Sequence, residues 1–347
     1  YINGIGSVSI QNTEVSNFSF EEIATLQPVN YAKHPSYKDL IPAGMIRRMA
    51  NGVKMGIYAS QKALNEAQIE IPDAIITGTG MGCLQDSEKF LRAIIENEEE
   101  FLTPTSFIQS THNTVGSQVA LRLGCKGYNF TYVNGANSFE NALLDAKLQI
   151  ENEEEKDILV GGIDEISDYT LSLLKKINFV KNNDELIDFK EPQTAGVPFG
   201  EGANFVVLSN QKTATSYANI QDILIQNTIK TDKIEEVLQE FLSKNSIKIT
   251  DIDVLVVGRN GDINFNEHYQ VLENLFETQS QVYYKHISGE FDTASSYGFL
   301  VAANILKTQN VPKELSWNNK PTTQANYVLC YNQYREKDHS FVLLKKC

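Results

Sequence analysis

The 347-residue sequence has few cysteines and no long hydrophobic run. The four cysteines are far apart and include no C-x-x-C pair, which argues against a disulfide framework and a structural zinc site. No segment reaches about 18 consecutive apolar residues, the length that crosses a bilayer. The N-terminal residues do not have the pattern of a signal peptide. We therefore expect a cytosolic protein without a membrane partner. The cysteines are Cys83, Cys125, Cys330 and Cys347.

Basic residues are also scarce. The chain has 30 Lys and Arg against 44 Asp and Glu, a formal net charge of −14. Binding to nucleic acid or to an anionic membrane surface needs a surplus of cations. Neither partner is expected, and the simplest interpretation of the charge is a well-hydrated surface.

Metal and cofactor motifs are missing as well. The five histidines do not occur at spacings typical of metal ligands. Residues 78–82 read G-T-G-M-G, but the third glycine is misplaced for a dinucleotide signature and no acid follows at the expected distance. A tight strand-to-helix turn explains these glycines better. We expect no metal and no cofactor. The histidines are His34, His112, His268, His286 and His339.

The hydrophobic pattern predicts an α/β protein in which short buried strands alternate with helices. The order of elements is similar in two parts of the chain, which favours two halves, residues 1–210 and 211–347, joined by the polar and weakly periodic stretch 210–230. We predict strands at 1–10, 73–77, 129–133, 157–161, 202–209, 254–257, 281–284, 325–331 and 340–345. We predict helices at 45–67, 87–95, 113–123, 138–151, 233–245, 267–276 and 294–307.

Three carboxylates stand next to glycines at predicted strand ends. Asp164 and Glu165 follow G-G, and Glu201 lies in G-V-P-F-G-E-G-A. Such groups either serve acid–base chemistry or accept backbone hydrogen bonds that hold a turn. The second role is favoured for the Asp164–Glu165 pair, and both roles stay open for Glu201.

Five segments, taken in order, resemble the β-ketoacyl synthases of the thiolase-like superfamily over nearly the whole chain. The resemblance implies a layered α-β-α-β-α fold made of two pseudo-duplicated halves. Lys285 and Glu201 match positions that this family retains. The segments are 76–82 (ITGTGMG), 113–116 (NTVG), 127–131 (GYNFT), 157–162 (DILVGG) and 198–203 (PFGEGA).

The family uses a nucleophilic cysteine at a helix N-terminus and two histidines. Here N-F-T-Y-V-N-G-A-N-S puts Ala136 in the cysteine position. V-V-G-R-N-G puts Gly258 in the first histidine position, or Arg259 after a one-residue slip. K-H-I-S-G-E keeps Lys285 but has Glu290 in the second histidine position. The glycine-rich gating segment is replaced by Y-N-Q-Y-R-E-K-D. The resemblance thus implies no catalytic residues.

A synthase-like chain without catalytic residues resembles a chain length factor, the inactive subunit that pairs with an active ketosynthase. The implied role is to shape the acyl tunnel of a heterodimer in polyketide, aryl polyene or fatty-acid-like biosynthesis. An acidic acyl carrier protein would be repelled by a charge of −14, so we expect it to dock on the partner.

The family dimer forms across the strand that precedes the nucleophile, here residues 128–133. Residues 84–91 and 107–113 are expected to reach the tunnel, whose wall excludes additional methylenes. The tunnel and interface candidates are Ser87, Leu91, Phe107, His112, Phe130 and Tyr132.

Two alternatives remain. In the first, the chain is an active condensing enzyme with a relocated nucleophile, Cys83, and His112 or Glu290 as its base. In the second, it is a homodimeric scaffold or binding protein that pairs with no synthase.

Overall fold

The computed structural model describes residues 1–11, 23–322 and 324–347. One five-stranded sheet comes from the first part of the chain, in the order β1-β7-β5-β3-β4. In this sheet β7 is antiparallel to both neighbours, and β3 is parallel to β4 and β5. The strands are β1 (Ile2–Val8), β3 (Ala74–Gly78), β4 (Asn129–Tyr132), β5 (Asp157–Asp164) and β7 (Gly202–Ser209).

A second five-stranded sheet has the order β10-β9-β11-β12-β8. Numbered along the chain within each sheet, both have the order third, second, fourth, fifth, first, with the same parallel and antiparallel pairs. The predicted α/β fold with two similar halves is confirmed; the division after residue 210 stays a prediction. The strands are β8 (Asn219–Gln226), β9 (Val254–Val257), β10 (Ser280–Tyr283), β11 (Tyr327–Tyr334) and β12 (Lys337–Lys345).

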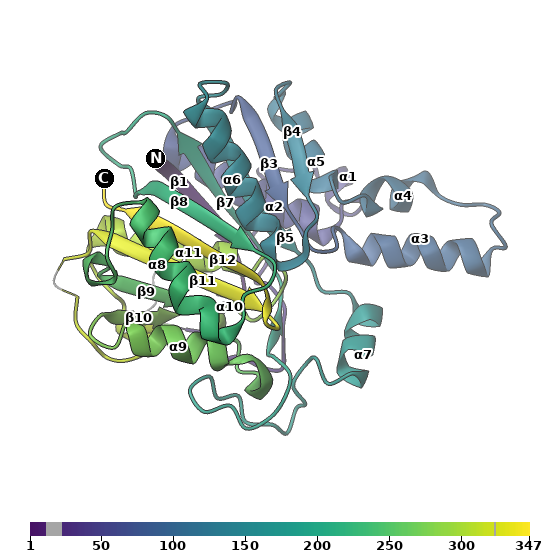
Figure 1. Cartoon of the computed structure of the whole chain (residues 1–347). Coiled ribbons are helices and arrows are strands. Elements are labelled where there is room, and N and C mark those ends of the chain that lie inside the picture. The colour runs from purple at the N-terminus through teal and green to yellow at the C-terminus, as the bar shows by residue number, and fades with distance from the viewer. Residues whose placement is uncertain (12–22, 323) are drawn as a thin grey trace.

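Helices form three layers around the two sheets (Figure 1). The central layer is α6 (Ser138–Glu151) and α11 (Ser295–Thr308), whose alanines pack in one core with buried residues of both sheets. Small side chains let the backbones approach closely, as a helix layer between two sheets requires. The outer faces are covered by α2 (Asn51–Ala67) and α5 (Thr114–Leu123) on the first sheet, and α8 (Ile234–Lys244) and α9 (Glu267–Leu275) on the second.

The other described α-helices range from 4 to 13 residues. None of the helices in the described ranges is both long and apolar enough to span a bilayer. These other helices are α1 (Ala43–Ile46), α3 (Leu84–Glu96), α4 (Pro104–Ser110), α7 (Asp168–Lys176) and α10 (Lys285–Ser288). The strands β2 (Val29–Asn30) and β6 (Phe199–Gly200) form a separate parallel pair.

Three local differences from the sequence-based expectations have physical reasons. The helix expected over 45–67 is interrupted between α1 and α2, where extended Ala50 is the N-cap of α2. Strand β8 lies inside the expected polar junction; it is a half-buried edge strand, so its alternation is weak. Helix α4 was not predicted, although Pro104 in its first turn is a recognised start signal.

The start of α6 packs directly on the end of β3. A Cβ on Gly78 would lie 2.5 Å from the carbonyl carbon and oxygen of Ser138, whereas a Cβ on Gly44 would meet nothing within 4 Å. We expect Gly78→Ala to lower the free energy of unfolding by about 1–3 kcal/mol, because overpacking forces the backbone to shift. Gly44→Ala should leave it nearly unchanged. Urea unfolding measures both variants, and equal stabilities would contradict this packing.

Candidate functional site

The turn before α6 holds Ala136, the residue that the sequence predicts at the nucleophile position of the family. Ala136 lies in the 3-10 turn η1 (Gly135–Asn137), and its side chain is buried. Ser138 fastens this turn: its Oγ donates to the Thr79 carbonyl at 2.9 Å and accepts from the Asn134 amide at 2.8 Å. The head of the central helix is therefore well ordered by hydrogen bonds and presents a methyl group, which cannot form an acyl-enzyme.

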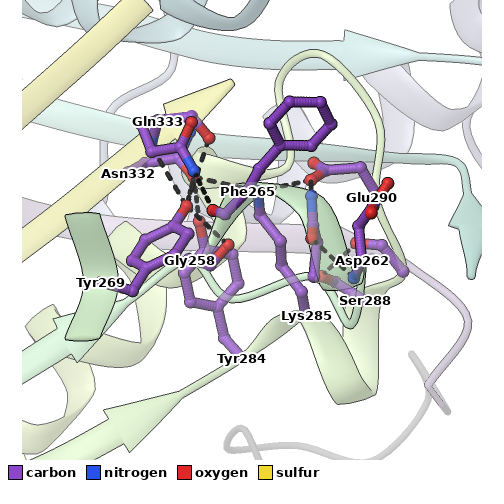
Figure 2. Close-up of polar contacts among 12 residues, drawn as sticks. Gly258, Asp262, Phe265, Tyr269, Tyr284, Lys285, Ser288, Glu290, Asn332 and Gln333 are labelled. Atoms are coloured by element: carbon purple, nitrogen blue, oxygen red, sulfur yellow. Dashed lines mark hydrogen bonds and ion pairs between the residues drawn. The ribbon is translucent and has the colours of Figure 1, made fainter. Parts of the chain in front are cut away.

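Glu290, which the sequence predicts at the second histidine position, belongs to a buried ion pair. Lys285 Nζ lies 2.8 Å from Glu290 Oε2, and the two residues are 1% and 3% exposed. The side-chain amide of Asn260 donates to the same Oε2 at 2.8 Å. Lys285 donates to Asn332 Oδ1 at 2.9 Å (Figure 2). Buried charges are tolerated when they are paired and hydrogen-bonded in this way.

Gly258, which the sequence predicts at the first histidine position, has no space for a side chain. A Cβ on Gly258 would lie 2.2 Å from Asn332 Oδ1 and 3.0 Å from the Tyr284 hydroxyl. Tyr269 donates from its hydroxyl to the Gly258 carbonyl at 2.8 Å and fixes the backbone there (Figure 2). An imidazole at this position would require the Asn332 network to move.

Arg259, the alternative residue for the first histidine position if the match is shifted by one residue, is bound to Glu273. Its guanidinium makes two hydrogen bonds to the Glu273 carboxylate, at 2.6 and 2.8 Å. It also lies 4.9 Å from the ring centroid of Trp317. A bidentate, stacked guanidinium of this kind anchors structure and does not act as a base.

Asp164 and Glu165 hold backbone turns. Asp164 accepts hydrogen bonds from the Gly80 amide at 2.8 Å and the Thr293 amide at 2.9 Å, and so joins segments far apart in the chain. Glu165 accepts from the Gly52 amide at 2.6 Å and the Gln85 amide at 2.9 Å. Burial raises the pKa of both carboxyls, that of Glu165 to about 7.

Glu201 also acts as a backbone acceptor. Its carboxylate accepts from the Ala32 amide at 2.9 Å and from the Ile166 amide at 2.8 Å. Of the two roles left open by the sequence, the contacts match the one that holds a turn. Burial raises the pKa of Glu201.

A further carboxylate that sequence patterns do not indicate is Asp292. It packs against Gly80, where a Cβ would lie 1.9 Å from its Oδ2, so only glycine fits there. Burial, and then the negative charges of Asp164, Glu290 and Asp338, raise the pKa of Asp292 to about 7. Asp338 in turn lies 3.8 Å from the Cβ position of Gly135, next to the head of α6. Acidic surroundings raise a thiol pKa and so disfavour a thiolate.

Residues 331–338, which are predicted to replace the glycine-rich gating segment, contain the turn of a tight β-hairpin. Tyr334 pairs with Lys337, and the two residues between them, Arg335 and Glu336, have φ of 52° and 63°. Two consecutive left-handed residues are typical of a type I′ turn, which connects two strands directly.

The interface candidates on β4, Phe130 and Tyr132, form an aromatic row with Tyr128 just before the strand; Tyr132 is partly buried. This strand lies at an edge of the first sheet. Tyr128 is 40% and Phe130 is 44% exposed, and the rings of Phe130 and Tyr132 have centroids 4.9 Å apart. An exposed sheet edge with apolar side chains is a surface that favours pairing with another chain.

The other candidates lie on or beside α3 and α4. Ser87 donates to the Ser110 carbonyl at 3.1 Å and joins the two helices. Leu91 and Phe107 are more than half exposed, and His112 follows α4 on the surface beside Gly82. Their place in a tunnel wall stays a prediction.

Cys83 has surroundings opposite to those of a nucleophile. The thiol is 1% exposed, and burial followed by the charges of Glu165 and Asp86 raises its pKa well above the ordinary value. A reactive cysteine needs access to solvent or substrate and nearby positive charge.

Among the described residues, no group of three or more His, Cys, Asp or Glu side chains is arranged to hold a metal ion.

Comparison with known proteins gives one family. The family model "Beta-ketoacyl synthase, N-terminal domain" matches residues 30–214. A 3-oxoacyl-[acyl-carrier-protein] synthase 2 of Staphylococcus aureus is 22% identical over 223 residues, 61% of this chain and 52% of the relative. The chain thus spans about half the length of the curated relatives that it matches.

Solved structures share the fold over the whole chain. The ishigamide ketosynthase/chain length factor superposes with a TM-score of 0.79 at 16% identity. A β-ketoacyl synthase of Burkholderia phymatum gives 0.77 at 15%, and a ketosynthase in complex with its chain length factor from Xenorhabdus doucetiae gives 0.75 at 14%. Each covers 100% of this chain and 98% of the other. The thiolase-like fold implied by the sequence is confirmed.

The buried ion pair between Lys285 and Glu290 can be tested by substitution. Lys285→Met leaves a buried carboxylate without its cation, and we expect it to lower the free energy of unfolding by about 3–5 kcal/mol. Glu290→Gln should also destabilise, because it leaves the lysine unpaired. The double variant should be more stable than the sum of the two losses implies. Urea unfolding of the four proteins measures the coupling, and strictly additive losses would contradict a direct pair.

A second prediction concerns pH. The folded chain keeps a proton on Asp292 up to about pH 7, whereas the unfolded chain releases it near the ordinary pKa of 3.8. Raising the pH through this window therefore favours the unfolded state. We expect the stability of the wild type relative to Asp292→Asn to fall by about 1.4 kcal/mol per pH unit there. Urea unfolding at a series of pH values tests this, and parallel profiles would show that Asp292 titrates normally.

Proposed function

Because this chain belongs to the β-ketoacyl synthase family, we propose that it is a catalytically silent subunit that pairs with an active β-ketoacyl synthase. The observation that carries the proposal is Ala136, the residue at the head of the buried central helix α6. Acyl transfer in the family needs a thiolate there, and a methyl group cannot accept an acyl chain.

The two histidine positions support the same conclusion. Gly258 faces Asn332 with no room for an imidazole, and Glu290 is held by Lys285 and Asn260. A residue already committed to a buried ion pair is a poor general base. Neither residue offers the hydrogen-bond donor that stabilises a developing enolate.

We propose that the partner pairs along β4, where the aromatic row of Tyr128, Phe130 and Tyr132 stands at the sheet edge. In this assembly Ser87, Leu91, Phe107 and His112 would help to close the partner's acyl tunnel. A bulky side chain in such a wall limits the length of the product, since each additional buried methylene is worth about 0.8 kcal/mol.

The structural neighbours are consistent with such a pair. One is titled a ketosynthase/chain length factor, and another a ketosynthase in complex with its chain length factor. We propose a cytosolic role in polyketide, aryl polyene or fatty-acid-like assembly. The net charge of −14 disfavours direct docking of an acidic carrier protein, so the carrier would meet the active subunit.

Association with an active synthase is the test. Co-expressed with a tagged synthase from the same source, the wild-type chain should co-purify in equal amounts. Phe130→Glu places a charge in the aromatic row and should reduce recovery at least about tenfold, a loss typical of a central interface residue. Leu186→Glu is the control, because that side chain is 73% exposed on the loop between α7 and β6.

Loss of pairing in the Phe130 variant alone, with both variants folded by circular dichroism, supports the proposal. A wild-type chain that forms only a homodimer in the presence of the synthase would overturn it and favour the scaffold alternative.

A further inference from the structure

Helices α3 and α4 form an arm that extends away from the first sheet, with their connecting loop at its outer end (Figure 1). The two helices pack on each other: the rings of Phe90 and Phe107 have centroids 5.2 Å apart, and Ser87 donates to the Ser110 carbonyl. We call residues 95–101, the end of α3 and the start of the connection, the arm tip.

The arm exposes an unusual amount of apolar surface. Leu91 and Ile95, one helical turn apart on α3, are 59% and 79% exposed, and Phe101 is 89% exposed. Phe107 and Ile108 on α4 are each more than half exposed. Several exposed large apolar side chains on one protruding element are typical of a surface that another protein covers.

The charges at the tip have a single sign. Glu96, Glu98, Glu99 and Glu100 are exposed, and the sequence has no Lys or Arg between Arg92 and Arg122. In the part of the chain that is described, none of these four carboxylates takes part in an ion pair. The tip therefore joins a large apolar group, Phe101, to an uncompensated cluster of negative charge.

We infer that the arm tip docks into an apolar recess of the synthase subunit that is bordered by Lys or Arg side chains. This inference rests on the proposed function and adds the chemistry of the partner's surface. Phe101 and Ile95 fill the recess, and the glutamates pair with the basic rim. Opposite charges around an apolar centre speed association and reject partners of the wrong charge.

The same charges disfavour a second copy of this chain as the occupant. Acids outnumber bases by 44 to 30, so a copy is a poor source of a basic rim. Repulsion between like charges at an interface makes self-pairing less favourable than pairing with a basic partner. The arm tip thus favours the heterodimer.

The chain contains its own control for this charge. The pentapeptide E-N-E-E-E occurs at residues 96–100 and again at 151–155, at the end of α6. Replacing Glu98, Glu99 and Glu100 by Gln removes three charges from the tip. The matched variant, with Glu153, Glu154 and Glu155 replaced by Gln, removes three charges from the same pentapeptide elsewhere.

The experiment measures association and dissociation rates of each variant with the synthase subunit over a range of NaCl concentrations. We expect the tip variant to associate about five- to tenfold more slowly at low salt, with a flatter salt dependence, and the matched variant to behave like the wild type. Phe101→Ser should dissociate about tenfold faster. Because these side chains are exposed, the unfolding midpoints should be unchanged.

The outcomes separate the two proposals. Binding that is equally fast and equally salt-dependent in the tip and matched variants overturns the arm-tip inference and leaves the proposed heterodimer standing. A wild-type chain that does not bind the synthase at all overturns the proposed function, and the arm-tip inference with it.

Discussion

The buried ion pair between Lys285 and Glu290 determines what the centre of this molecule can contain. Two charges away from water are stable only when their remaining hydrogen-bonding capacity is used, and here Asn260 and Asn332 use it. The carboxamide of Asn332 then occupies the space beside Gly258, so that no side chain fits there. The same ion pair thus includes Glu290 and, through Asn332, leaves no room for a side chain at residue 258, the two residues predicted at the family's histidine positions.

The surroundings of the α6 head agree with this. Asp292 and Asp338 place carboxylates near the turn that holds Ala136, and burial keeps the pKa of Asp292 raised. A thiolate nucleophile needs positive potential, which a helix N-terminus supplies only partly. The described interior is held by buried hydrogen bonds and ion pairs, while the arm and the β4 edge expose apolar side chains.

Much of the fold could be predicted from the sequence, because buried strands such as 157–161 are short apolar runs that end at glycines. The family motifs also predict Ala136, Gly258 and Glu290 at the positions of the family's cysteine and two histidines, an assignment that stays a prediction. The role of Asn332 could not be foreseen, because it depends on contact with residues about 45 to 75 positions away in sequence. For the same reason the sequence did not predict the hydrogen bond between Asp164 and the Thr293 amide, which joins residues far apart in the chain. Strand β8 was not predicted because an edge strand buries only part of one face, so its hydrophobic alternation in the sequence is weak.

The central claim is that this chain accepts no acyl group. Its most direct test is to incubate the purified complex of this chain and its synthase with an acyl-carrier thioester, and to weigh both intact subunits by mass spectrometry. The account predicts an acyl mass increase on the synthase subunit alone, with this chain unmodified. An acyl adduct on this chain, located by peptide mapping to Cys83 or any other residue, would contradict it.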